Sequence, residues 1–148
     1  MVAGCISENS SLLLNSVNIN PTRTGVIEIL KLMGGNIELL NQRFQAGELI
    51  ADIKVSSSKL KGIEIPENLV PLAIDEFPVL FIAASCADGE TVLTGAKELR
   101  VKESDRIQVM ADGLNSLGIK NNVLEDGIRI LGGEFTKQNS SIKMYKYH

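Results

Sequence analysis

Residues 91–118 read TVLTGAKELRVKESDRIQVMADGLNSLG and predict a strand, a charged turn and a helix in that order. The strand is expected over 91–96. The helix presents one apolar face through residues three or four positions apart, namely Ile107, Met110, Leu114 and Leu117. It is expected to stop at Gly118, because glycine commonly ends a helix. Two more strands, 119–124 and 128–131, are expected on either side of a short turn.

The residues before this segment extend the same pattern. A short strand is expected over 62–65 and a helix over about 76–87. Asp75 can cap that helix, and Pro78 is tolerated in its first turn. Residues 62–132 then read as β-α-β-α-β-β.

The first part of the chain repeats that order without its first strand. The expected elements are the end of an apolar helix over 1–6, a strand over 10–19, a helix that Asn20 caps, and strands over 37–40 and 49–55. The helix endings also match, because LKLMG at 30–34 lies 84 residues before LNSLG at 114–118. The agreement in element order and helix ending predicts an internal repeat.

We therefore expect an α+β fold built from βαβαββ units. Residues 1–58 are expected to form an incomplete unit and residues 59–133 a complete one, about one and five-sixths units in all. A polar tail follows at 134–148. Because the chain enters in mid-helix and leaves in this tail, we expect it to be a fragment of a longer protein.

Composition excludes several classes of protein. The chain of 148 residues has 15 basic and 18 acidic side chains and a net charge of −3, which gives no basic surface for nucleic acid. No apolar run approaches the ~20 residues of a membrane span. Cys5 and Cys86 provide neither a disulfide framework nor metal-ligand spacing, and are expected to be buried small side chains. We expect a cytoplasmic protein whose chemistry uses carboxylates and cationic groups, because the only histidine is His148.

The densest group of charged residues is RVKESDR at 100–106, where five of seven residues are charged. It lies where the chain enters a helix. Its basic side chains would add to the free N–H groups there in attracting phosphates or carboxylates. The alternative is a solvated first turn whose charges pair with one another.

Two further segments are candidates for a site. Asp75, with Glu76 after it, is either a helix cap or an ionised base that faces a pocket. The segment NINPTRTG at 18–25 is either part of a site or a helix entry with Arg23 exposed. Asp75 and the segment 100–106 hold equivalent places in the repeat, so we expect them to converge at one end of a sheet.

Three stretches together resemble the 5-enolpyruvylshikimate-3-phosphate synthase family: NPTRTGV at 20–26, AIDEFP at 73–78 and, above all, ELRVKESDR at 98–106. The resemblance runs from about Val2 to Gly133 and covers the larger part of the family's second, C-terminal domain. It implies an inside-out α/β barrel made of βαβαββ units. It also implies transfer of the enolpyruvyl group of phosphoenolpyruvate to the 5-hydroxyl of shikimate 3-phosphate, with release of phosphate and without a cofactor.

The resemblance implies roles for single residues. Asp75 matches the carboxylate that binds shikimate 3-phosphate and takes the proton of its 5-hydroxyl. Lys102 matches a lysine that contacts both substrates, and Glu103 matches the proton donor to the methylene carbon of phosphoenolpyruvate. Arg106 matches an arginine that binds phosphoenolpyruvate. Glu98 falls where some members have an asparagine that binds shikimate 3-phosphate.

Other motifs of the family have no counterpart in this chain: its Lys-Ser motif, its Gly-Asn-Ala-Gly-Thr loop and its C-terminal lysine. We therefore expect the chain alone to be inactive, and to self-associate through unpaired strand edges and apolar surface. Two alternatives stay open. One is the related transferase that acts on UDP-N-acetylglucosamine, which lacks the RVKESDR string, and the other is a non-catalytic module that keeps the fold.

Overall fold

The structure is a computed structural model, and it describes residues 1–101 and 104–133. The helices are α1 (Val2–Ile6), α2 (Gly25–Leu32), α3 (Phe77–Cys86) and α4 (Arg106–Ser116), and the 3-10 helices are η1 (Pro21–Arg23), η2 (Glu67–Leu69), η3 (Pro71–Ala73) and η4 (Lys97–Arg100). The strands are β1 (Ser11–Asn18), β2 (Asn36–Gln45), β3 (Glu48–Ser56), β4 (Glu90–Leu93), β5 (Asn121–Val123) and β6 (Ile128–Leu131). This mixture of helices and antiparallel strands confirms the predicted α+β class.

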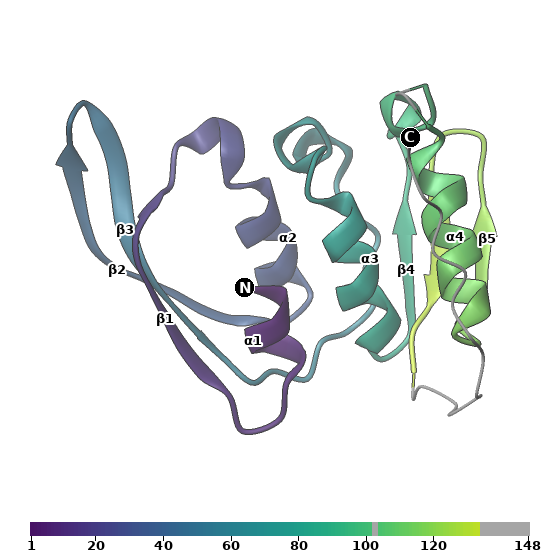
Figure 1. Cartoon of the computed structure of the whole chain (residues 1–148), viewed down its shortest axis with the longest axis horizontal. Helices are drawn as coiled ribbons and strands as arrows, with labels where there is room; N and C mark the ends of the chain where they lie inside the picture. The colour runs from purple at the N-terminus through teal and green to yellow at the C-terminus, as the bar shows by residue number, and fades with distance from the viewer. Residues whose placement is uncertain (102–103, 134–148) are drawn as a thin grey trace, which may run out of the picture.

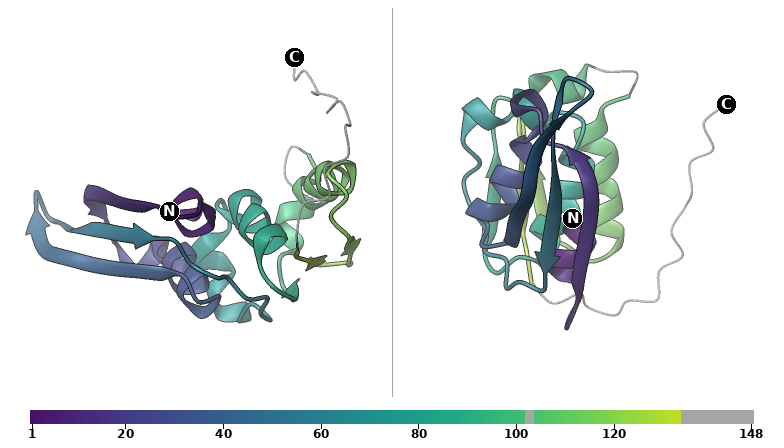
Figure 2. Two further views of the ribbon diagram at one scale, coloured as in Figure 1. Left: turned by 90° about the horizontal axis from the view of Figure 1, so that it is seen from below. Right: turned by 90° about the vertical axis from the view of Figure 1, so that its left-hand side faces the viewer.

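The strands form two three-stranded antiparallel sheets, in the orders β1-β3-β2 and β4-β6-β5. In each sheet the last strand in sequence lies in the centre. The two sheets lie at opposite ends of the described chain, and α1, α2 and α3 lie between them (Figures 1 and 2). A repeated unit would produce this shared strand order. The division into units at 1–58 and 59–133 stays a prediction.

Both helices of the expected repeat end in the same way. After α2, Gly34 has φ 91° and donates to Lys31 O at 2.9 Å, while the next N–H donates to Leu30 O at 2.8 Å. After α4, Gly118 has φ 79° and donates to Asn115 O at 3.0 Å, while the next N–H donates to Leu114 O at 2.9 Å. This is the Schellman arrangement, and its left-handed residue is one that glycine adopts without strain.

Several predicted boundaries need correction. The strand predicted over 62–65 is wrong, because residues 61–65 make only two isolated parallel bridges, Lys61 with Asp88 and Glu64 with Val92. Pro66 has no N–H and cannot continue the pairing. The helix predicted after Asn20 is divided into η1 and α2, and Asn20 caps η1 by accepting from the Thr22 N–H at 3.2 Å. The second strand of the first sheet is longer than predicted and reaches residue 45.

A polar network interrupts both outer strands of the first sheet at the same level. The pairing of β1 shifts between Leu14 and Val17, and that of β2 shifts between Leu40 and Arg43. The central strand supplies the link, because the Asp52 carboxylate accepts from Asn41 Nδ2 and from the Ser16 N–H, both at 2.8 Å. Both hydrogen bonds hold the pKa of the Asp52 carboxyl below its ordinary value, and the bond from Asn41 contributes the larger part. Ser16 and Asn41 both have left-handed φ values, 54° and 49°.

The core lies between the two sheets. Its largest fully buried side chains include Ile29, Leu30, Ile53, Phe77 and Ile107. Phe77 packs beside Phe81, with 6.0 Å between the ring centroids. These residues come from β3, α2, α3 and α4, so one continuous core joins the two expected units.

The two cysteines differ in their surroundings. Cys5 is buried, as predicted, and burial raises the pKa of its thiol. Cys86 is only partly buried, so the prediction was wrong for this residue. It lies at the last position of α3, where the helix end leaves the core.

Thr91 carries the one buried side-chain oxygen among the described residues that has no hydrogen-bond partner, its Oγ1. The side chain lines a small apolar space with Ile29, Leu93 and Ile130. An unpaired hydroxyl there opposes folding, so we expect Thr91→Val to raise the free energy of unfolding by about 1 kcal/mol. Urea denaturation of the two proteins measures it. Thr94→Val is the control, because the Thr94 hydroxyl donates to Glu67 Oε1 at 3.2 Å; an equal gain in both variants would contradict the explanation.

Candidate active site

Asp75 lies in the turn between η3 and α3, with its side chain 74% exposed. Of the two alternatives left open for Asp75, the helix cap is wrong, because α3 begins at Phe77 and its N-cap residue is Glu76. Few N–H groups at the start of α3 need a side-chain acceptor. Pro78 has no N–H, and the Val79 N–H donates to the Glu76 carbonyl at 3.1 Å. The carboxylate is therefore directed outward.

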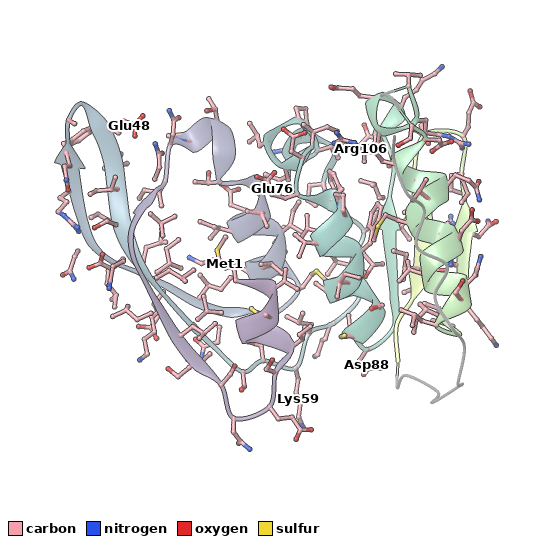
Figure 3. All side chains as sticks on the ribbon, in the orientation of Figure 1. Met1, Glu48, Lys59, Glu76, Asp88 and Arg106 are labelled. Carbon is pink, nitrogen blue, oxygen red and sulfur yellow. The ribbon has the colours of Figure 1, made fainter. Side chains whose placement is uncertain are left out.

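Arg106 is the first residue of α4, and its Nη1 lies 3.5 Å from Oδ1 of Asp75. The two residues are 31 positions apart in sequence, so only the tertiary fold brings them together. This is the convergence predicted from the sequence. Arg106 and Glu76, the neighbour of Asp75, lie at the end of the molecule opposite Lys59 and Asp88 (Figure 3). The pair is exposed to solvent, with 40% of the Arg106 side chain accessible.

The rest of the charged turn is partly used for structure. Arg100 Nη2 and Nε lie 2.9 and 3.0 Å from Oδ2 of Asp105, and Arg100 Nη1 donates to the Leu124 carbonyl. Asp105 also caps α4 by accepting from the Gln108 N–H at 3.0 Å. Pairing within the turn, which the sequence left as an alternative, therefore applies to Arg100. Arg106 instead extends across to Asp75.

The structural role of Asp105 was missed in the sequence. The cap fixes the first turn of α4, from which Arg106 projects. The spacing of Asp105 and Gln108 was the available signal, because an acceptor followed three positions later by Glu or Gln is typical of a helix start. The position of the segment at a helix entry was predicted, but the cap that fixes this entry was not.

The other predicted site residues are placed as follows. Glu98 lies in η4 and is exposed. Lys102 and Glu103 lie outside the described residues. The segment that contains Arg23 forms η1, which contacts η3 and so lies beside the turn that holds Asp75.

Two cavities accompany these elements. One of about 380 Å³ is lined by Glu76, Val26, Ile27 and Val79 among others, and it adjoins the turn that holds Asp75. Another of about 750 Å³ lies at the other end of the molecule, near Lys59 and Asp88 (Figure 3). The first cavity is lined mostly by apolar side chains, and neither Asp75 nor Arg106 is among its lining residues. The capacity to bind anions therefore rests on the exposed Arg106 guanidinium itself.

Residues 1–101 and 104–133 contain neither a membrane-spanning helix nor a cluster of metal ligands. None of the helices there combines the length and apolar character of a membrane span. In the same residues, no three His, Cys, Asp or Glu side chains are grouped as metal ligands.

Comparison with known proteins identifies the family. The family model for EPSP synthase (3-phosphoshikimate 1-carboxyvinyltransferase) matches residues 1–148. The chain is 63% identical to the 3-phosphoshikimate 1-carboxyvinyltransferase of Vesicomyosocius okutanii subsp. Calyptogena okutanii and 66% identical to that of Ruthia magnifica subsp. Calyptogena magnifica. Each alignment covers 100% of this chain and 34% of the relative.

Solved structures agree with this assignment. The structure superposes on an EPSP synthase from Acinetobacter baumannii with a TM-score of 0.87 and 63% identity, covering 88% of this chain and 30% of that one. The fold expected from the resemblance is therefore confirmed for this part of the enzyme. The chain spans about a third of the length of the relatives that it matches, and it belongs to the EPSP synthase family.

Proposed function

We propose that the longer protein to which this chain corresponds transfers the enolpyruvyl group of phosphoenolpyruvate to the 5-hydroxyl of shikimate 3-phosphate and releases phosphate. The observation that carries the proposal is the 3.5 Å approach of Arg106 to Asp75 across two helix entries. It places a carboxylate that can accept a proton beside a guanidinium that can bind a phosphate or carboxylate. The reaction needs a proton acceptor and an anion-binding group close together, because both of its substrates are anions.

In this proposal each residue has a defined task. Asp75 binds shikimate 3-phosphate and takes the proton of its 5-hydroxyl, while Arg106 binds phosphoenolpyruvate. Lys102 contacts both substrates, and Glu103 gives a proton to the methylene carbon. Glu98 is a further ligand of shikimate 3-phosphate. Fixed cations lower the barrier by stabilising the charged tetrahedral intermediate, and the reaction needs no metal or organic cofactor.

The test uses a full-length enzyme that contains this chain. Phosphate release is measured with phosphoenolpyruvate and either shikimate 3-phosphate or UDP-N-acetylglucosamine as acceptor. We expect phosphate to be released when the acceptor is shikimate 3-phosphate and not when it is UDP-N-acetylglucosamine. Release only with the UDP-sugar would indicate the related transferase, and no release with either acceptor would favour a non-catalytic module.

The chain of 148 residues is expected to be inactive by itself and to self-associate. It exposes large apolar side chains on the first sheet, including Leu13 at 57% and Phe44 at 79%, and such surface favours association. Light scattering over a range of concentrations measures the oligomeric state, and a phosphate assay measures turnover. A monomer at high concentration would contradict self-association, and turnover close to that of the full-length enzyme would contradict inactivity.

We place the full-length enzyme in the cytoplasm.

A further inference from the structure

Gly25, the first residue of α2, lies against the backbone of Leu72 in η3. A Cβ atom at residue 25 would stand 2.7 Å from the carbonyl carbon of Leu72 and 2.8 Å from its oxygen. These separations are shorter than a real Cβ contact, and backbone atoms cannot rotate aside as a side chain can. The close approach of α2 and η3 therefore requires glycine at this position.

The contact is connected directly to Asp75. Leu72 lies three residues before Asp75, and the segment between them is a tight turn in which the Glu76 N–H donates to the Ala73 carbonyl at 3.0 Å. A shift of η3 would therefore move Asp75 with it. Arg106 would not follow, because it stands on α4, which Asp105 caps separately.

We propose that Gly25 is a positioning residue for the reaction: by letting α2 pack on the Leu72 carbonyl, it sets where the Asp75 carboxylate stands relative to Arg106. This inference rests on the proposed function, in which Asp75 is the base. It assigns a task to the segment 20–26, which the resemblance contains but to which it gave no role.

The experiment is a double-mutant cycle in the full-length enzyme, with phosphate release from the two substrates as the assay. We expect Gly25→Ala to lower kcat by about ten- to a hundredfold, because misplacing a reacting group by about 1 Å has an effect of this size. In the Asp75→Asn background the same change should lower kcat less than about twofold, since the group that it displaces is no longer a base. A merely structural effect of Gly25→Ala would lower kcat equally in both backgrounds.

Gly113→Ala is the matched control. Gly113 lies within α4, and a Cβ added there meets nothing within 4 Å. We expect kcat to stay within about twofold of the original enzyme, because an exposed helix interior tolerates alanine. A loss in this variant as large as that in Gly25→Ala would overturn the inference.

The remaining outcomes separate the two proposals. If Asp75→Asn keeps full turnover, the assignment of the base fails and the role of Gly25 fails with it. If Asp75→Asn is impaired but Gly25→Ala has no effect, or an equal effect in both backgrounds, only the role of Gly25 fails. If Gly25→Ala does not fold, Pro71→Gly takes its place, because this change loosens η3 without adding volume. The inference would again be overturned if Pro71→Gly lowered kcat equally in both backgrounds, or did not lower it at all.

Discussion

In the full-length enzyme, Asp75→Asn is expected to lower kcat by about 10²- to 10⁴-fold, the usual contribution of a general base. The substitution keeps the size of the side chain and removes its ability to take a proton. The side chain is 74% exposed and caps no helix, so the fold should be unchanged. Steady-state phosphate release gives kcat, and circular dichroism and thermal denaturation test the fold.

The control for this variant is Asp88→Asn. Asp88 is also exposed, but it lies at the other end of the molecule from Arg106 (Figure 3). We expect this enzyme to keep turnover within about twofold of the original. Turnover of Asp75→Asn as high as that of Asp88→Asn would show that Asp75 is not the base.

The second large effect concerns stability. Phe77→Ala is expected to lower the free energy of unfolding by about 3–5 kcal/mol, the range measured when a large buried side chain is truncated. Phe77 is completely buried and packs beside Phe81, so its removal loses apolar contacts and leaves a cavity. Urea denaturation of the chain, followed by circular dichroism, measures the change through the shift of the midpoint.

Val79→Ala in the same helix provides the comparison. Val79 is 43% exposed, so the truncation leaves no enclosed cavity, and we expect a loss of less than about 1 kcal/mol. Similar losses for Phe77→Ala and Val79→Ala would mean that the start of α3 is not packed in the core as described.

The parts of the fold that depend on local signals could be predicted from the sequence. The glycines at 34 and 118 end their helices through contacts within a single turn, and the apolar faces of those helices follow from residue spacing. The convergence of Asp75 and Arg106 could be predicted because both were expected at helix entries in equivalent places of the predicted repeat. The segment at 62–65 could not be predicted correctly, because whether it forms a strand depends on its partner β4 and on Pro66.

The site shows the same limit. The segment 100–106 was expected to present its cations together, yet Arg100 is held by Asp105 and by the carbonyl of Leu124, which lies 24 positions away. A contact over that distance has no local signal. A helix cap was one of the two interpretations of Asp75 because acidic residues often cap helices, but Pro78 removes one of the N–H groups that a cap would satisfy.

The Asp52 network has a consequence for how the first sheet meets other polypeptides. The regular ladder runs for only four residues along β1, Ser11 to Leu14, and for five along β2, Asn36 to Leu40, before each bulge changes the register. A foreign strand that aligned with either margin would lose its hydrogen-bonding match at the bulge. Pairing along a strand edge, which the sequence led us to expect, is therefore limited to these short stretches, and the exposed apolar side chains of the sheet provide the remaining surface for association.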